Sequence, residues 1–378
     1  MRQKGSIIFW FDSPPKVGKG AFNFVARNWP LPVYYIFNND FREERKRTNW
    51  DDGDFGGANL IRLYNLQNCD QTIQSFFADR TNIHIVNGFT TRIMRRIQRY
   101  IKQKGINLLV LSERPDAMGG YIERIFRELF FQIKYRHLFH SFNPYVTAFL
   151  PLGQLGKSVF MKYGWNDEKI FPFMYNPAIN IPANWPDLVR RTPLRFLYVG
   201  RFYFKTKGVD VLIKAANHLK GEWELDFVGG YGRDTKAVLR WISQKSNVHY
   251  LGSWDSGSVV TNMQAYDVVI IPTKYDGWNL LVNEALHAGI GVITTDGAVS
   301  HEIIDKSGAG IVIKKNSSKQ LTKAIQGVID DPNIVITWKE KARCFVKQIS
   351  TPVVGQYLID IINYTVFNEG TRPQCPWI

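Results

Sequence analysis

PTKYDGWNLLVNEALHAGIGVITTDGAVSHEI, residues 272–303, carries more information about the fold than any other stretch of this chain. An apolar strand pattern, DVVIIP, leads into a short loop, YDGWN, and the loop leads into an apolar-patterned segment that predicts a helix. Two carboxylates, Asp276 in the loop and Glu284 on the helix, lie eight positions apart. Eight helical residues make roughly two turns, so this spacing brings both carboxylates toward one side.

The chemistry at the start of this helix suits a phosphorylated sugar. The free backbone N–H groups and the positive end of the helix dipole favour a phosphate. The carboxylates of Asp276 and Glu284 beside them favour the hydroxyl groups of a sugar or a ribose. The combination fits a bound nucleotide sugar.

This motif resembles the acidic-x7-acidic signature, usually E-G-F-G-L-x-x-x-E-A-x-A-x-G, of the large family of retaining glycosyltransferases with the GT-B fold (glycosyltransferase family 4-like). Two departures are clear, since Asp276 stands in place of the first Glu, and Trp278 with Asn279 in place of Phe-Gly. The resemblance extends over roughly residues 190–330 and, more faintly, through the N-terminal half. The matching positions are Gly277, Leu280, Glu284, Ala285 and Gly289.

Length and composition agree with a cytoplasmic protein of two domains. The chain has 378 residues and is 45% hydrophobic, which is enough for two cores of ordinary size. No apolar run approaches the ~20 residues of a membrane-spanning helix. The three cysteines, Cys69, Cys344 and Cys375, are scattered and show no metal-ligand spacing, so a reducing cytoplasm is the simplest setting.

The positive charge is unevenly distributed. The formal net charge is +15, and residues 1–190 carry 26 Lys and Arg against 16 Asp and Glu. Residues 191–378 carry 22 against 17, so the N-terminal half holds +10 of the excess. That half is expected to meet an anionic partner such as a phosphate, a lipid headgroup or a nucleic acid.

The C-terminal half alternates continuous apolar runs with helical patterns, which predicts a parallel sheet covered on both faces. Strands are predicted at 194–200, 223–230, 247–253, 267–273 and 291–296. Helices are predicted at 208–219 and 235–244, besides the motif helix. Ligands of such sheets bind beyond the carboxyl ends of the strands.

The N-terminal half repeats this pattern, with strands predicted at 6–12, 32–37, 83–86, 107–112, 146–150 and 170–174, and a helix at 91–105. A proline-rich linker is predicted at 176–193. The expected fold is therefore α/β of the GT-B class, with two Rossmann-like doubly wound domains facing each other across a cleft. The predicted parts are an acceptor-binding domain at 1–180, a nucleotide-sugar-binding domain at 190–350, and a C-terminal helix and tail at 351–378 that cross back to the first domain.

Basic residues follow the strand LRFLYVG. Arg201 comes directly after it, and the family has a Lys-Gly pair shortly afterwards, which matches Lys207 and Gly208 if the loop is one residue longer than usual. Lys205 is the alternative. These cations are expected to neutralise the departing diphosphate, or else they form a solvated basic loop.

The resemblance implies roles for individual residues: Glu284 on the ribose, Asp276 on the transferred sugar, and Asp276, Arg201 and Lys207 as catalytic residues. The implied donor-binding set is Gly18, Arg201, Lys205, Lys207, Asp276, Gly277, Trp278, Asn279, Leu280 and Glu284. Gly18 and Gly20, with Lys16 and Lys19, lie in a glycine-rich loop between the first predicted strand and the first helix, where the family has a loop that approaches the donor phosphates and the acceptor. Glu113 and Arg114 end a strand and are candidates for the acceptor, although a local ion pair between them is an equal alternative.

We therefore expect a retaining glycosyltransferase (a hexosyltransferase) that transfers a hexose-type sugar from a nucleoside-diphosphate sugar to a glycan or glycolipid, in surface polysaccharide biosynthesis. No metal and no cofactor are expected. One alternative is a nucleotide-sugar epimerase of the GT-B type. The other is a non-enzymatic nucleic-acid-binding protein, which only the charge suggests, because the basic residues do not alternate with aromatic ones.

Residues 121–142 show a helical stripe of apolar positions at 122, 125, 126, 129, 130 and 133. Arg124, Arg127 and Lys134 lie off the stripe, and Arg136, His137 and His140 follow it. If exposed, this helix would suit an anionic membrane surface, and the protein would be peripheral on the inner face of the membrane. The alternative is that the stripe packs on the N-terminal sheet.

Overall fold

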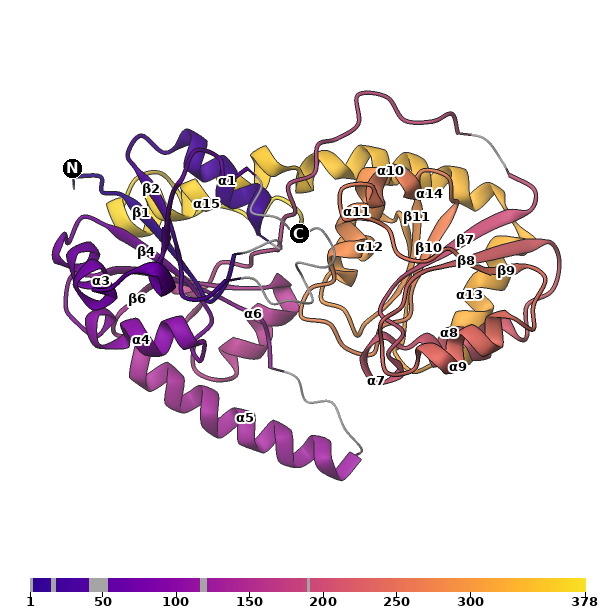
Figure 1. The fold of residues 1–378 in the computed structure, drawn as a ribbon, viewed down its shortest axis with the longest axis horizontal. Helices are drawn as coiled ribbons and strands as arrows, with labels where there is room; N and C mark the ends of the chain where they lie inside the picture. The colour runs from indigo at the N-terminus through magenta and orange to yellow at the C-terminus, as the bar shows by residue number, and fades with distance from the viewer. Residues whose placement is uncertain (1–2, 15–17, 41–53, 116–120, 189–190) are drawn as a thin grey trace. The chain divides into compact units, whose positions relative to one another are not determined.

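The computed structural model describes residues 3–14, 18–40, 54–115, 121–188 and 191–378. The chain divides into two compact units (Figure 1). Unit 1 comprises Met1–Ala178 and Thr351–Pro376, and unit 2 comprises Ile179–Ser350 with Trp377–Ile378. Within the described residues, each unit is built on one six-stranded sheet whose strands are all parallel. The predicted doubly wound α/β fold is confirmed.

The sheet of unit 1 has the order β3-β2-β1-β4-β5-β6. Its central strands β1, β4 and β5 are buried along almost their whole length, which explains why they read as largely unbroken apolar runs rather than as alternating patterns. The strands are β1 (Ile7–Phe11), β2 (Val33–Phe37), β3 (Asn59–Arg62), β4 (Ile83–Asn87), β5 (Asn107–Ser112) and β6 (Val146–Pro151).

Helices cover both faces of this sheet, and they are α1 (Lys19–Asn28), α3 (Cys69–Ala78), α4 (Arg92–Ile101), α5 (Tyr121–Phe142), α6 (Gly153–Met161) and α15 (Thr351–Ile362). Short helical turns lie at Leu63–Asn65, Asp167–Lys169 and Asn363–Phe367. The last helix, α15, packs tightly against α1. A Cβ atom on Gly355 would lie 2.5 Å from a ring carbon of Phe24, so only glycine permits this approach.

The sheet of unit 2 has the order β12-β11-β10-β7-β8-β9. Its strands are β7 (Leu194–Gly200), β8 (Trp223–Gly229), β9 (Val248–Tyr250), β10 (Val268–Ile271), β11 (Gly291–Thr295) and β12 (Gly310–Ile313). The helices are α7 (Phe204–Lys207), α8 (Val209–Ala216), α9 (Thr235–Ile242), α10 (Val259–Met263), α11 (Leu280–Ala288), α12 (His301–Ser307), α13 (Ser318–Asp330) and α14 (Asn333–Phe345), followed by a 3₁₀ turn at Val346–Ile349.

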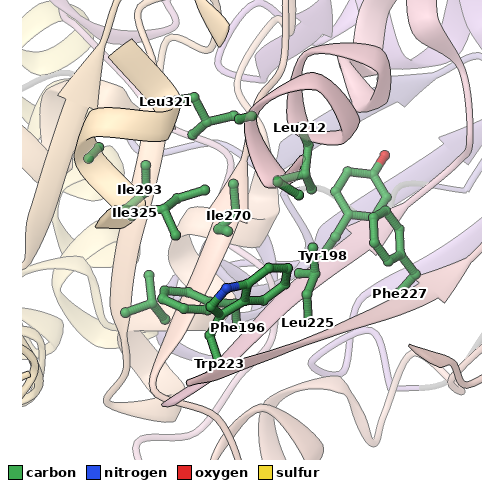
Figure 2. Packing of buried hydrophobic residues seen from close by; sticks show 14 of the residues in the cluster. Phe196, Tyr198, Leu212, Trp223, Leu225, Phe227, Ile270, Ile293, Leu321 and Ile325 are labelled. Atoms are coloured by element: carbon green, nitrogen blue, oxygen red, sulfur yellow. The ribbon is translucent and has the colours of Figure 1, made fainter. Parts of the chain in front are cut away.

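The core on one face of this sheet is formed by strand residues and by helices α8 and α13. Figure 2 shows Tyr198 and Phe227 of the sheet near Leu212, Phe196 beside Trp223, and Leu321 and Ile325 near Ile270 and Ile293. These side chains are almost completely buried. Burial of a large apolar side chain stabilises the fold by about 1.5–3 kcal/mol, so this cluster anchors the sheet that carries the candidate site.

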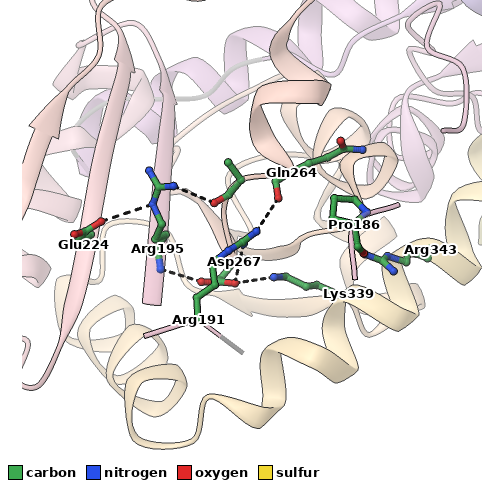
Figure 3. A network of polar contacts seen from close by, with 9 residues as sticks. Pro186, Arg191, Arg195, Glu224, Gln264, Asp267, Lys339 and Arg343 are labelled. Carbon is green, nitrogen blue, oxygen red and sulfur yellow. Dashed lines mark hydrogen bonds and ion pairs between the residues drawn. The ribbon is translucent and has the colours of Figure 1, made fainter. Parts of the chain in front are cut away.

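A buried charge network ties the first strand of unit 2 to its last helix (Figure 3). Asp267 is buried and accepts a hydrogen bond from Lys339 Nζ at 2.6 Å and from the backbone N–H of Arg195 at 3.0 Å. Arg191 Nη1 lies 3.3 Å from the same carboxylate. Arg195 also pairs with Asp226 at 3.0 Å. Because a buried charge needs partners, these contacts specify how α14 docks on the sheet.

Two predictions about strands need correction. The segment 170–174 does not form a full strand but makes two isolated bridges, one between Ile170 and Phe149 of β6 and one between Phe173 and Leu152, directly after β6. The backbone N–H groups of Phe171 and Phe173 donate to the carbonyls of Phe149 at 2.9 Å and Pro151 at 2.8 Å. Pro172 between them has no N–H to offer a strand on the other side, so this segment ends the sheet. Strand β3 was not predicted, because this edge strand is short, half-exposed and partly polar.

Candidate active site

The predicted site residues of unit 2 gather at the switch point of its sheet. Strands β7 and β10 are neighbours, and the chain winds from β7 to β8 and β9 on one side and from β10 to β11 and β12 on the other. The carboxyl ends of two such strands leave a crevice that binds ligands in open α/β sheets. Arg201 follows β7 directly, and the loop Pro272–Asn279 follows β10.

The loop ends at a residue with strained backbone geometry. Asn279 has φ 78° and ψ 92°, a region that most residues with a Cβ avoid. The family motif has glycine here, and asparagine is among the side chains that tolerate such a conformation best. Its Oδ1 also accepts a hydrogen bond from the backbone N–H of Leu281 at 3.1 Å. Asn279 therefore both turns the chain and caps α11.

Trp278 has its side chain in the interior. The indole is 1% exposed, and its Nε1 donates a 2.8 Å hydrogen bond to Asn283 Oδ1 within α11. The backbone carbonyl of Trp278 accepts from the N–H of Ser300 at 3.0 Å. Trp278 thus fixes the start of α11 against the segment after β11. Its buried side chain does not face a donor substrate.

Two of the predicted charged residues are in direct contact. Lys207 Nζ lies 2.5 Å from Asp276 Oδ2, and both side chains are about three-quarters buried, with 25% and 21% exposed. Lys205 lies on the same short helix, α7, but is exposed. Of the two alternatives left by the sequence, Lys207 is therefore the lysine placed against the motif carboxylate.

Close backbone packing joins the loops after β7 and β10. Gly208 has φ 66°, and a Cβ atom there would lie 1.9 Å from the carbonyl oxygen of Pro272. Thr273 Oγ1 donates to the carbonyl of Thr206 at 2.9 Å, and the N–H of Lys274 donates to the same oxygen at 2.8 Å. The close packing thus requires glycine at position 208, directly after the lysine that pairs with Asp276.

A second ion pair beside the first was missed in the sequence. Lys274 Nζ lies 2.8 Å from Asp210 Oδ2, and both side chains are mostly buried. The backbone N–H of Asp276 also donates to the carbonyl of Gly297 at 3.0 Å, which ties the motif loop to the loop after β11. Nothing in the spacing of Lys274 and Asp210 indicates the pair, because it arises from the adjacency of β7 and β10.

Glu284 lies on the second turn of α11 and is half-buried. One turn further on, the buried His287 places Nδ1 2.8 Å from the carbonyl of Asn283. Burial lowers the pKa of His287, so this imidazole is neutral at physiological pH. The acidic side chain of Glu284 is therefore the charge that this part of α11 contributes to the site. Gly277 and Leu280 flank Trp278 and Asn279 in the same loop and first turn.

Arg201 has an exposed side chain, and a hydrogen bond from the buried Tyr198 fixes its backbone. Tyr198 Oη donates to the carbonyl of Arg201 at 2.9 Å. Burial raises the pKa of Tyr198 well above its usual value, so the phenol remains a donor. A Cβ atom on Gly229 would lie 2.3 Å from the carbonyl of Gly200, so the ends of β7 and β8 are in close contact beside Arg201.

In unit 1 the predicted residues also lie at carboxyl ends of strands. Gly18 is the N-cap of α1, and a Cβ atom there would lie 2.4 Å from the ring of Phe22. Lys19 Nζ lies 4.6 Å from the ring centre of Phe55, and Lys16 lies outside the described residues. Glu113, at the end of β5, accepts a 2.9 Å hydrogen bond from Tyr175 Oη.

Asp12 binds the start of a helix in unit 1, a contact that the sequence did not reveal. It follows β1, and its two carboxylate oxygens accept from the backbone N–H groups of Ile93 at 2.6 Å and Arg92 at 3.1 Å. The carboxylate therefore occupies the positive end of α4, next to β1 at the switch point of this sheet. Within the described part of the chain, no group of three or more His, Cys, Asp or Glu residues could hold a metal ion.

Two doubly wound parallel sheets with this topology define the GT-B class of α/β proteins. Residues 193–331 match the family model described as glycosyl transferases group 1, and this segment holds every site residue named in unit 2. The match therefore concerns unit 2 and covers less than half of the chain.

Two relatives of known name share part of the sequence. The chain is 22% identical over 239 residues to N,N'-diacetylbacillosaminyl-diphospho-undecaprenol alpha-1,3-N-acetylgalactosaminyltransferase of Campylobacter jejuni, covering 62% of each protein. It is 28% identical over 148 residues to the lipopolysaccharide glucosyltransferase WaaG of Escherichia coli K12, covering 37% of this chain and 38% of that protein. The similarity thus spans less than two thirds of either relative.

Solved structures resemble the chain over nearly its full length. A glycosyltransferase from Rickettsia africae has a TM-score of 0.72 at 15% identity, covering 97% of this chain and 100% of that one. HepE of Anabaena in complex with UDP has a TM-score of 0.71 at 15% identity, covering 95% of this chain and 100% of that one. These structures establish the GT-B fold of the chain.

Proposed function

We propose that this protein is a retaining glycosyltransferase that moves a hexose-type sugar from a nucleoside-diphosphate sugar to a glycan or lipid-linked acceptor. The observation that carries the proposal is the pair of Lys207 and Asp276 at the switch point of unit 2. A cation and a carboxylate in contact, directly before the N-terminus of α11, offer complementary partners for a diphosphate and a sugar hydroxyl.

Each charged residue has a role in this proposal. Lys207 and Arg201 bind the diphosphate, whose negative charge grows as the sugar departs. The positive end of α11 adds to this field. Asp276 accepts hydrogen bonds from the transferred sugar, and Glu284 accepts them from the ribose, which is common to the donor and to the nucleotide product.

The bonding changes require no further reactant. An acceptor hydroxyl oxygen forms a bond to the anomeric carbon while the bond from that carbon to the phosphate oxygen breaks, and the electron pair stays on the phosphate. The acceptor proton passes to a diphosphate oxygen, so no protein base is assigned. Attack on the face from which the diphosphate leaves retains the anomeric configuration.

UDP is the first nucleotide to test, because HepE, which shares the fold, was crystallised with UDP and with UDP-glucose. The named relatives act on an undecaprenol-linked sugar and on lipopolysaccharide, so a lipid-linked surface glycan is the first acceptor class to test. A role on the cytoplasmic side of a membrane follows from that choice.

Calorimetric titration with UDP, GDP and dTDP tests the donor site directly. Lys207→Gln should weaken binding of the preferred nucleotide roughly ten- to a hundredfold, since a hydrogen bond to a charged group contributes ~1.5–3 kcal/mol. Lys205→Gln tests the other lysine, and Lys314→Gln, an exposed lysine paired with Asp296, is the matched control. Both should bind like wild type.

If none of these nucleotides or their sugars binds at millimolar concentration, the proposal is wrong. Product analysis with the preferred donor then separates the enzyme classes. A transferase yields a glycosylated acceptor, whereas an epimerase yields the epimeric nucleotide sugar without an acceptor. A nucleic-acid-binding protein would instead retain an oligonucleotide in a salt-sensitive manner.

A further inference from the structure

Helix α5 is apolar on two opposite sides. Its C-terminal half packs into the core of unit 1 through residues that include Phe131, Tyr135, Phe139 and Phe142. Tyr135, for example, stacks on Tyr163 with ring centres 5.3 Å apart. The other side carries the stripe predicted from the sequence, and it is exposed. The alternative that this stripe packs on the sheet is therefore wrong.

The exposed stripe consists of Ile122, Ile125, Phe126, Leu129, Phe130 and Ile133, whose exposed fractions range from 47% to 69%. Their spacing of three and four residues places them on one face of the helix. The first half of α5 also extends away from the sheet of unit 1 (Figure 1). A contiguous surface of six large, exposed apolar side chains marks a binding surface.

Basic residues extend the same face of α5 toward the C-terminus of the helix. The three- and four-residue spacing that connects the stripe leads next to Arg136, His137 and His140, and all three are exposed. On the flank, Arg127 is paired with Glu123 at 2.8 Å, so its charge is partly compensated. Arg136 shares the apolar face and is exposed, so the face is basic at one end.

An exposed apolar stripe with cations at one end is typical of a helix that lies on an anionic lipid surface. Apolar side chains insert into the boundary between headgroups and acyl chains, while cations beside them contact anionic headgroups. A second copy of the chain is disfavoured because two chains of net charge +15 repel each other. The helix is not a membrane span, since no helix in the described residues is long and apolar enough to cross a bilayer.

We infer that the exposed face of α5, from Ile122 to Ile133, docks unit 1 on an anionic lipid surface, with Arg136 at the headgroups. None of the residues of this face is among the proposed donor or acceptor residues. It can therefore succeed or fail independently of the proposed transferase activity.

Co-sedimentation with vesicles tests the inference on the full chain without donor. Vesicles of phosphatidylcholine mixed with phosphatidylglycerol should bind the wild type, and vesicles of phosphatidylcholine alone should bind it at least about tenfold less. Added salt should weaken the binding. Phe126→Asp plus Phe130→Asp should reduce it at least about tenfold, and Arg136→Glu should reduce the preference for the anionic vesicles.

The matched control is Leu31→Asp plus Leu66→Asp, which changes two exposed leucines of unit 1 outside α5 and should bind vesicles like wild type. Because Phe126 and Phe130 are exposed, their double variant should keep the thermal midpoint and the UDP affinity of the wild type; Ile125→Ser plus Leu129→Ser is the second variant if it does not. Absence of binding to anionic vesicles at low salt, or binding unchanged in the α5 variants, overturns the inference. So does a wild-type dimer that the α5 variants convert to monomer without any vesicle binding.

Discussion

Lys207 Nζ and Asp276 Oδ2 lie 2.5 Å apart although the two residues are separated by 69 positions in the chain. They meet because β7 and β10 are neighbours in the sheet and each residue follows one of these strands. Without a donor, the lysine is neutralised by the carboxylate, so an arriving diphosphate must compete with Asp276 for it. The two residues should therefore be energetically coupled in nucleotide binding.

This coupling separates the effects of the two motif carboxylates. Asp276→Asn should raise nucleoside diphosphate affinity, because Lys207 is released, while it lowers transfer of the sugar. Glu284→Gln should weaken the same affinity roughly ten- to a hundredfold, since ribose is present in donor and product. Calorimetry with the nucleoside diphosphate and an assay of transfer check both. Equal losses of nucleotide affinity would contradict the assignment.

A double-mutant cycle on Lys207 and Asp276 measures the competition itself. Lys207→Gln should weaken nucleotide binding, and Asp276→Asn in that background should have no further favourable effect. The expected coupling is about 0.5–3 kcal/mol in binding free energy. The neighbouring pair of Lys274 and Asp210 provides the control cycle. Additive effects on Lys207 and Asp276 would show that the contact does not bear on the donor.

Asn279 should tolerate glycine but not alanine. Asn279→Ala loses the cap on the Leu281 N–H and places a plain Cβ residue at φ 78°, so it should destabilise unit 2 by about 2 kcal/mol. Asn279→Gly relieves the backbone strain and should cost only a few tenths of a kcal/mol. Urea unfolding monitored by circular dichroism distinguishes these values. An alanine variant as stable as the glycine variant would refute the strain at this position.

Asp267 should be among the least replaceable polar residues of unit 2. Asp267→Asn leaves Lys339, buried with its amine 2.6 Å away, without a compensating charge, and should destabilise the fold by about 3–5 kcal/mol. Burial already lowers the pKa of Lys339. Asp267→Asn combined with Lys339→Met should recover part of the loss. Thermal and urea unfolding of the single and double variants checks this, and a double variant less stable than the single one would argue against it.

The buried His84 should make unit 1 sensitive to acid. Its Nδ1 accepts a 3.1 Å hydrogen bond from Trp10 Nε1, and burial lowers its pKa from 6.5 to about 3. Between these two values the unfolded chain binds a proton that the folded chain does not, so stability falls as the pH drops from about 6.5 toward 3. The loss at pH 4.5 should be roughly 2–3 kcal/mol.

The variant His84→Gln isolates this contribution, since glutamine can still accept from Trp10 but does not titrate. Its unfolding free energy should change less than that of the wild type between neutral pH and pH 4.5. His218→Gln, which replaces an exposed histidine, should behave like wild type. If wild type and His84→Gln lose the same free energy on acidification, the buried imidazole is not responsible.

The sequence predicted most of the strands and the region of the site because both depend on local patterns. Fully buried parallel strands read as continuous apolar runs, and β5, β7 and helix α5 have the predicted bounds. The acidic motif placed Asp276 and Glu284 on the loop and helix after β10. Edge strand β3 was missed because its half-exposed residues leave no such run.

Contacts between distant segments could not be predicted in this way. The choice between Lys205 and Lys207 depends on how the loop after β7 packs on Pro272, which spacing does not specify. The burial of Trp278 depends on Asn283, its partner in α11. Asp12 caps α4, which begins 80 residues later in the chain. The apolar stripe of α5 has the same spacing in the sequence as a buried helix face, so its exposure could not be predicted from the sequence alone.

The packing of α15 on α1 has a consequence for biosynthesis. Unit 1 is discontinuous in the chain, because Thr351–Pro376 completes it after the whole of Ile179–Ser350 has been translated. Unit 2 is contiguous over that range, so the ribosome releases all of its strands before the helix that covers α1 emerges. Helix α1 is therefore synthesised early, whereas the helix that covers it is synthesised only after Ser350, so the apolar surface of α1 stays uncovered in the meantime.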